Sequence, residues 1–352
     1  MALTDIDGGR LADNAFSLGK NLIINGAMQV AQRGTSFTGL TSGNNYSADR
    51  FIFSLTSSGT ATLTQSADAP VGFKNSFKIE FTAAAASPTE HKIEYRFEGQ
   101  DVQQLEWGTA NAKGITLSFY IKSNKTGNTQ FALQNSANDR SYIAPFTIDA
   151  ANTWERKTIY VPGDTSGTWL TGNDIGLRIR WGFYEASRQS STVNAWQSGL
   201  YQTRSDSPIN FADTIGNTFL LSGVQLEVGS VATPFEHRSY GQELSLCQRY
   251  FVSMNVTGFH WQATTTTRAN GTIVLPSVMR SSPVLTCENV NRITNFGVID
   301  YNGTYTFGGE NTTPTHISAS YTRSSGDSWT ANIPLAINST TQSTILTANS
   351  EL

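Results

Sequence analysis

The chain has 352 residues, of which 38% are hydrophobic and 14% charged, and its formal net charge is −3. This length favours two or three domains. The small acidic charge, without clusters of Lys or Arg, excludes sequence-independent binding to nucleic acid. No apolar run approaches the ~20 residues that span a membrane, so we expect no membrane insertion. Ser, Thr, Asn, Gln and Gly replace charged residues, which suits β-structure and hydrogen bonding to sugars.

The first segment, residues 1–20, contains Gly8-Gly9 and only scattered hydrophobic residues. It holds too few of them to bury a core by itself. It is therefore either a disordered tail or an arm that becomes ordered against a partner. It lacks the apolar run of a secretory signal, so we expect the chain to be made in a cytoplasm.

From Asn21 onward the sequence predicts one short strand after another. The run Leu22–Ile24 leads into Asn25-Gly26, a dipeptide typical of tight turns. Many short strands, separated by turn residues and without helical patterns between them, predict a β-sandwich. After Leu22–Ile24, the strand-like runs are 51–53, 61–64, 77–81, 93–97, 115–121, 129–133, 158–161, 175–181 and 218–226.

A long irregular segment, residues 184–213, is rich in Ser, Gln, Asn and Thr. Loops of this length are usually functional or disordered. Because Trp196 and Tyr201 lie within it, we expect an ordered surface loop.

The segment 223–251 combines a strand, a break and a short helix. Apolar residues alternate with polar ones over 224–228, and Pro234 ends the pattern. Ser239 is a predicted N-cap, and Gln242, three residues later, completes a capping box. We therefore expect a sheet to close here and a helix over 239–251 to lead into a second domain.

Residues 252–352 return to β-patterns. The run 298–307 contains Asn302-Gly303 and predicts a hairpin. About 100 residues suffice for a second, smaller sandwich. The two cysteines, Cys247 and Cys287, are expected to be free thiols, because a disulfide framework needs more of them at closer spacing.

Several stretches together resemble a recurrent module of phage virions. They are NLIINGAMQVAQRG at 21–34, YSADRF at 46–51, residues 98–127, residues 154–169, and residues 223–251. The resemblance runs almost continuously over 21–251. It is to tail-fibre and other surface-appendage proteins of tailed bacteriophages that carry a jelly-roll like that of carbohydrate-binding modules. Residues 274–286, VLPSVMRSSPVLT, resemble the start of the β-module that often follows.

The resemblance implies a virion surface protein, made in the host cytoplasm, that adheres to host surface glycans. One alternative is a purely structural decoration or connector of the head, neck or tail that binds only other virion proteins. A glycan depolymerase is the third reading. The implied all-β organisation is a virion-attachment arm (1–20), a jelly-roll β-sandwich (21–236), a short helical connector (237–252) and a smaller β-sandwich (253–352).

Aromatic residues around the 184–213 loop are the best candidates for sugar binding. An aromatic ring packs against the apolar face of a pyranose while neighbouring polar groups take its hydroxyls. We expect Trp154 and Trp181, on or beside strands, to be core residues. For the two loop residues, a trimer contact is an equal alternative, because interfaces are also rich in aromatics. The candidates for glycan binding are Trp169, Tyr184, Trp196 and Tyr201.

The sequence offers little support for catalysis, and we expect no enzyme. Its four histidines are isolated, and it has no phosphate loop or nucleophile elbow. The densest acidic run, 94–106, is the candidate for the paired carboxylates of a glycosidase. However, Glu94 and Glu98 alternate with Tyr95 and Phe97, as on a solvated strand face.

Jelly-rolls of the carbohydrate-binding type often hold a structural calcium ion, so calcium is the one cofactor that the resemblance implies. Its candidate oxygen ligands are Glu227 and Asn25. We also expect a homotrimer, because several weak sugar sites then add through effective concentration. The apolar stripe of the connector is the predicted contact between copies, formed by Leu244, Cys247, Tyr250 and Phe251.

Overall fold

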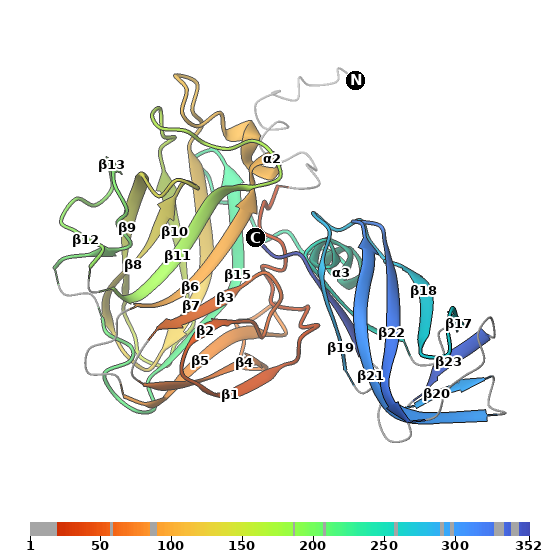
Figure 1. Cartoon of the computed structure of the whole chain (residues 1–352). Helices are drawn as coiled ribbons and strands as arrows, with labels where there is room; N and C mark the ends of the chain where they lie inside the picture. The colour runs from red at the N-terminus through yellow and green to blue at the C-terminus, as the bar shows by residue number, and fades with distance from the viewer. Residues whose placement is uncertain are drawn as a thin grey trace, which may run out of the picture.

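A computed structural model describes residues 20–56, 59–84, 90–185, 187–206, 209–256, 260–288, 292–295, 299–326, 334–338 and 345–352. The predicted arm lies outside these residues, apart from Lys20. The described chain forms two β-domains with a short helix between them (Figure 1). The prediction of an all-β chain is confirmed. Within these residues, no helix has both the length and the apolar character needed to cross a membrane.

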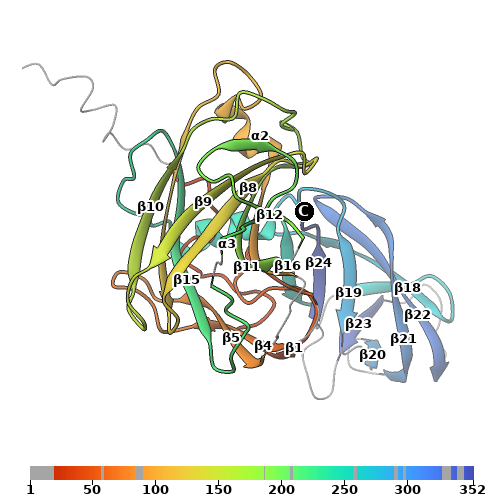
Figure 2. The ribbon, with the colours of Figure 1, turned by 90° about the vertical axis from the view of Figure 1, so that its left-hand side faces the viewer.

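The first domain is a sandwich of two sheets, seen edge-on in part in Figure 2. The six-stranded sheet has the order β1-β4-β5-β15-β7-β10, and the seven-stranded sheet has the order β13-β9-β8-β11-β6-β3-β2. A parallel pair, β12-β14, lies within the predicted loop, which is ordered as expected over its described residues. The strands are β1 (Ser36–Leu40), β2 (Gly43–Asn45), β3 (Ile52–Thr56), β4 (Thr60–Ser66), β5 (Ser76–Ala83), β6 (Glu90–Glu98), β7 (Ile115–Ser123), β8 (Gly127–Gln134), β9 (Arg140–Ile148), β10 (Glu155–Val161), β11 (Ile175–Glu185), β12 (Gln189–Ser190), β13 (Trp196–Ser198), β14 (Thr203–Arg204) and β15 (Thr218–Val228).

Alternating side chains of the strands separate the core from the outer faces. In β7, the odd-numbered residues from Ile115 to Ile121 are fully buried, while Tyr120 on the opposite face is partly exposed. Trp181 in β11 is 1% exposed and lies in the core, as predicted. Trp154 does not: it precedes β10 on the outer face, and its indole N–H donates to Asp68 over 3.0 Å. The prediction of a core position is therefore confirmed for Trp181, which lies within a strand, and wrong for Trp154, which lies just before one.

The Asn25-Gly26 turn forms as predicted. The amide of Met28 donates to the carbonyl of Asn25 over 2.8 Å, and Asn25 has a φ of 61°. Position 26 requires glycine, because a Cβ there would lie 2.1 Å from the carbonyl oxygen of Val224. The run Leu22–Ile24 is not assigned as a strand, although the amide of Leu22 donates to the carbonyl of Leu226 in β15.

The predicted capping box opens helix α3 (Tyr240–Gln248). The Ser239 hydroxyl accepts from the amide of Gln242, and the Gln242 side chain accepts from the amide of Ser239. The helix is shorter than predicted, because Phe251 already begins the next strand. Two short turns precede β7 in the first domain, α2 (Gly99–Val102) and η1 (Gln103–Leu105).

The second domain was expected as a sandwich, and its strands instead close into a barrel. The barrel order is β17-β18-β22-β21-β20-β23, and a three-stranded sheet, β16-β24-β19, lies beside it. Closure leaves a barrel without free edges. Trp261, 3% exposed, packs on Tyr321 in its core. The strands are β16 (Phe251–Asn255), β17 (His260–Ala263), β18 (Arg268–Val274), β19 (Val284–Glu288), β20 (Arg292–Asn295), β21 (Ile299–Thr312), β22 (His316–Gly326), β23 (Pro334–Asn338) and β24 (Ile345–Asn349).

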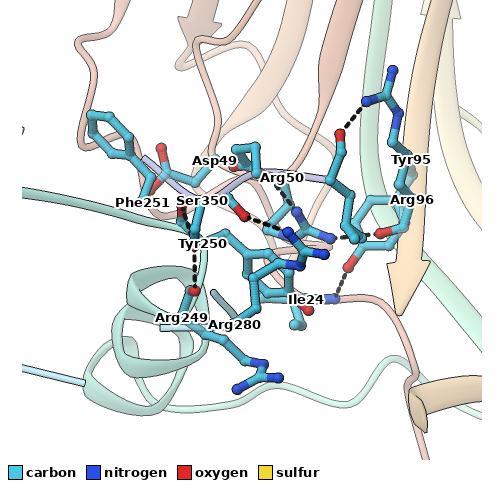
Figure 3. A network of polar contacts seen from close by, with 12 residues as sticks. Ile24, Asp49, Arg50, Tyr95, Arg96, Arg249, Tyr250, Phe251, Arg280 and Ser350 are labelled. Carbon is cyan, nitrogen blue, oxygen red and sulfur yellow. Dashed lines mark hydrogen bonds and ion pairs between the residues drawn. The ribbon is translucent and has the colours of Figure 1, made fainter. Parts of the chain in front are cut away.

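The last residues of the chain join the two domains. The label C in Figure 1 lies between them, where Glu351 follows β24. The Glu351 carboxylate pairs with Arg50 and, over 3.3 Å, with Arg33 of the first domain. The carbonyl of Leu352 accepts from Arg96. Figure 3 shows Arg50 and Arg96 gathered at this contact with Tyr95 and Tyr250.

Aromatic rings cover the same cations. The Arg50 guanidinium lies 3.4 Å from the centre of the Tyr250 ring, and Arg33 lies 3.6 Å from that of Phe251. Burial by itself lowers the pKa of Arg50, but the charge of Glu351 raises it overall, so Arg50 stays charged inside the contact. A second link is the pairing of Arg249 with Glu98 over 2.7 and 2.8 Å.

These contacts correct the predicted oligomer surface. Cys247 and Tyr250 are fully buried within the chain, and Phe251 is 6% exposed. Leu244 is half-buried. Three of the four predicted contact residues are therefore covered within the chain itself, whereas a contact between copies through Leu244 stays a prediction.

We expect Glu351→Gln to destabilise the chain by about 3 kcal/mol, because it leaves the buried Arg50 without a counter-charge. Urea unfolding followed by tryptophan fluorescence measures the effect. The matched control is Glu80→Gln, which breaks an exposed pair with Lys78 and should cost less than about 1 kcal/mol. Equal effects of the two substitutions would contradict the role of the contact.

Candidate functional site

The outer face of the six-stranded sheet carries a groove of about 360 Å³. Pockets that bind small molecules typically measure roughly 300–1,000 Å³, so the groove has the size of a ligand site. We call it the sheet groove. Its lining includes Phe73, Ser118, Tyr120, Arg156, Phe235 and His237.

The floor of the sheet groove follows from strand register. Tyr120 in β7 lies opposite Arg156 in β10, so both project from the outer face. On the other side of β7, the register of β15 shifts between Ser222 and Gln225. Gly223 lies in this bulge with a φ of 59°, and a Cβ there would lie 2.7 Å from Phe73 and 2.9 Å from Tyr120. The glycine therefore makes room for both rings.

One wall is the segment 229–238, which folds back along the sheet after β15. Both carboxylate oxygens of Glu227 accept from Thr233, one from its amide and one from its hydroxyl. The Gln225 side chain accepts from the amide of Glu236 over 2.8 Å. The carbonyl of Thr233 accepts from Arg156 over 3.1 Å. The outward polar side chains of the sheet thus hold the wall in place.

The rings of the sheet groove form one aromatic surface. Phe73, in the loop between β4 and β5, lies 5.5 Å from Tyr120, 4.8 Å from Phe235 and 5.2 Å from His237, measured between ring centres. His237 is exposed and the other three rings are partly exposed. Apolar ring faces beside the hydroxyl of Ser118 and the donors of Arg156 suit a ligand that is apolar on one face and polar at its edge.

Two of the four residues predicted to bind glycans, Trp169 and Trp196, lie together, but outside the sheet groove. Trp169 and Trp196 pack edge to face with each other and with Trp107, with ring centres 4.6 to 5.5 Å apart. The three indole N–H groups all donate to backbone carbonyls, over 2.7 to 3.1 Å. This tryptophan cluster therefore ties three loops together.

A smaller pocket of about 140 Å³ lies beside the tryptophan cluster, lined by Leu105, Trp107, Trp169 and Leu170 among others. It is less than half the volume of the sheet groove and lies below the usual range for ligand sites. Its rings are largely occupied with one another, which leaves less of their faces for a sugar.

The other two predicted residues lie elsewhere. The carbonyl of Tyr201 accepts from Gln134 over 2.8 Å, which fixes the 187–206 segment onto the seven-stranded sheet. The Tyr201 ring is half-buried beside Gly199. Tyr184 belongs to β11, and its side chain lies outside the described residues. The four residues do not share one described pocket, and their binding of glycans stays a prediction.

The two strand residues of the acidic run, Glu94 and Glu98, are not on a solvated face, contrary to expectation. Glu94 is 0% exposed and is paired with Arg180 over 2.6 Å, with Lys92 over 3.3 Å and with Arg96. Burial by itself raises the pKa of Glu94, but the surrounding cations, Arg180 first, lower it to about 2. Glu98 is equally buried, against Arg249. A general acid needs a raised pKa, so Glu94 does not have the property of the acid of a glycosidase.

The predicted calcium ligands bind protein groups. The side-chain oxygen of Asn25 accepts from the amide of Val30, and the amide of Asn25 donates to Glu243 in α3. Glu227 is engaged by Thr233, as described above. In the part of the chain that the structure describes, no group of three or more His, Cys, Asp or Glu could hold a metal ion. Calcium binding by Asn25 and Glu227 stays untested.

Sequence reasoning did not find the residues of the sheet groove or Trp107. One signal was present: in 115–121 every second residue from Ile115 is apolar, so Tyr120 falls on the opposite face with Ser118. An aromatic ring on an otherwise polar strand face indicates a binding surface or a covered one. Nothing local in the sequence indicates that Phe73 and Phe235 lie beside it.

Comparisons with known proteins show limited likeness. No family model matches the chain, and no curated protein matches it. Among solved structures, the enzymatically active domain of tailspike protein 4 of bacteriophage CBA120 is 10% identical with a TM-score of 0.31, over 60% of this chain and 22% of that one. A family 22 carbohydrate-binding module of Clostridium thermocellum Xyn10B is 12% identical with a TM-score of 0.30, over 56% and 98%. A family 11 module from the same organism, in complex with a mixed-linked tetrasaccharide, is 12% identical with a TM-score of 0.29, over 57% and 99%. At these TM-scores the likeness carries no argument about function.

The stability of the chain should depend on pH through Glu94. Its pKa is lowered from 4.5 to about 2 in the folded chain, so the carboxylate stabilises the fold above about pH 4.5 and loses this contribution as the pH falls toward 2. The difference corresponds to about 3 kcal/mol. A carbon-13 NMR titration of the Glu94 carboxyl group should give a midpoint near 2, and a midpoint at 4.5 or above would contradict the buried cluster.

Proposed function

We propose that this chain is a glycan-binding surface appendage protein of a tailed-bacteriophage virion and that the sheet groove is its glycan site. The observation that carries the glycan site is the set of aromatic faces around Tyr120, held open by Gly223 and bordered by hydrogen-bonding side chains. A pyranose has the matching character, with an apolar face made of C–H groups and hydroxyls around its rim.

The sheet groove is favoured over the tryptophan cluster as the glycan site for two reasons: its volume is larger, and it is lined by a donor that is exposed. It offers about 360 Å³ against about 140 Å³. The indole N–H groups of Trp107, Trp169 and Trp196 are used within the protein. Arg156, by contrast, is exposed and lines the sheet groove. Sugar recognition needs donors and acceptors that are not already committed.

The virion role is supported by the resemblance of 21–251 to phage appendage modules and by the arm that precedes it. In this proposal, residues 1–20 bind other virion proteins and the chain is displayed on the particle surface as a homotrimer. Trimerisation would present three sheet grooves and raise the avidity of weak sugar contacts. A purely structural virion protein is the competing function, which the absence of glycan binding would favour.

Tyr120→Ala should lower the affinity for a bound glycan about fivefold to thirtyfold, because a buried aromatic contact is worth on the order of 1–2 kcal/mol. A glycan array with residues 21–352 identifies the ligand, and isothermal titration calorimetry measures the affinity. The matched control is Tyr160→Ala, which removes an exposed tyrosine on the same sheet face but outside the sheet groove.

If Tyr120→Ala binds like the unchanged chain while Trp169→Ala loses binding, the glycan site belongs to the tryptophan cluster instead. If the unchanged chain binds no host surface glycan on the array, the glycan function itself is overturned. Circular dichroism of each variant verifies that the sandwich is intact.

The virion proposal predicts a particle-bound trimer. Light scattering should give three times the chain mass of 38.3 kDa, and antibodies against the chain should label intact particles in electron micrographs. A monomer at micromolar concentration would contradict the trimer. Particles that bind no antibody would contradict the virion location.

A further inference from the structure

The charges of the sheet groove differ in sign from those of the chain as a whole. The protein carries 27 acidic and 24 basic residues, a formal net charge of −3. Among the residues that line the sheet groove, the one permanent charge is the guanidinium of Arg156. No Asp or Glu belongs to that lining. The positive character is therefore local to the groove.

Arg156 is not neutralised by a neighbour within the described residues. Its hydrogen bond goes to the carbonyl of Thr233 over 3.1 Å, and no described carboxylate lies within ion-pairing distance of it. Two acidic side chains on this side of the sheet, Glu227 and Asp68, are engaged by other groups. Glu227 accepts from Thr233, and Asp68 pairs with Lys122 over 2.9 Å.

The hydrogen bond to Thr233 also orients the guanidinium. It uses one N–H of a group that has five, in a rigid planar fork. The Arg156 side chain lines the sheet groove and lies opposite Tyr120 of the neighbouring strand. A guanidinium in this state suits a carboxylate, which it can bind through two parallel hydrogen bonds.

We infer that the sheet groove takes an acidic glycan, with the carboxylate of a uronic acid or a similar sugar acid on Arg156 and the sugar ring on the aromatic surface. This rests on the proposed function and names its ligand class. The ring of such a sugar has an apolar face that can pack on Tyr120 and Phe73. Its carboxylate supplies a negative charge for Arg156, and the lining itself contains no Asp or Glu.

The test uses an array of bacterial surface polysaccharides on which each acidic polymer stands beside its carboxyl-reduced form. We expect the full chain to bind acidic polymers, and to lose about tenfold to a hundredfold in affinity when the carboxyl groups are reduced, which is the range for a charge-assisted hydrogen bond. Binding should also weaken with rising salt.

Variants of Arg156 test whether its positive charge, rather than the shape of the groove, binds the acidic polymers. Arg156→Gln should lose affinity for acidic polymers by about the same factor as carboxyl reduction, and should lower the affinity for the reduced polymers much less, because glutamine keeps a hydrogen-bond donor but not the charge. Arg156→Lys should retain part of the affinity, because it keeps the charge and loses the planar fork. The matched control, Lys122→Gln, removes a cation of the same sheet face that Asp68 already neutralises, and should change the affinity less than about twofold.

The outcomes distinguish the two proposals. Equal binding of acidic and reduced polymers, lost in Tyr120→Ala but not in Arg156→Gln, overturns the acidic ligand and keeps the glycan site. No binding to any polymer overturns both. Binding of poly-glutamate as tightly as the acidic polysaccharides overturns the sugar component and favours an acidic protein partner.

Discussion

The buried guanidinium of Arg50 is the interaction on which the arrangement of the two domains depends. It is held by the carboxylate of Glu351 and by the ring of Tyr250, both of which come from beyond the first domain. A charge in such a position is costly unless it is paired and hydrogen-bonded. The pairing therefore ties the end of the chain to the sandwich, and the helix α3 and strand β24 must both be in place for Arg50 to be buried.

The same segment that enters this contact also builds the sheet groove. After β15 the chain runs back over the outer face of the six-stranded sheet, where Gln225 and Glu227 hold residues 233–236. It then enters α3, whose Glu243 binds the amide of Asn25 and pairs with Arg238 over 2.9 Å. One wall of the groove is thus anchored to the sheet on one side and to the joint between the domains on the other. Rigid walls lower the entropic cost of binding a ligand.

The sandwich uses its two outer faces differently. On the seven-stranded sheet, the segment 187–206 covers a buried cluster in which Glu94 is paired with Arg180. On the six-stranded sheet, the segment 229–238 covers only part of the outer face, and aromatic rings beside Arg156 stay partly exposed. Covered polar residues serve the fold, whereas an uncovered aromatic surface next to an unneutralised arginine offers a place for a ligand.

The sequence by itself determined the features that depend on neighbours along the chain. The turn at Asn25-Gly26, the capping box at Ser239 and the all-β character follow from local backbone preferences and from the period of two in a strand. The same period is consistent with Tyr120 on an outer face, but it does not specify what covers that face. Only the tertiary structure decided that Phe73 and Phe235 meet Tyr120, and that Tyr250 and Phe251 cover arginines of their own chain, because these residues are far apart in the sequence and come together through sheet pairing and chain reversal.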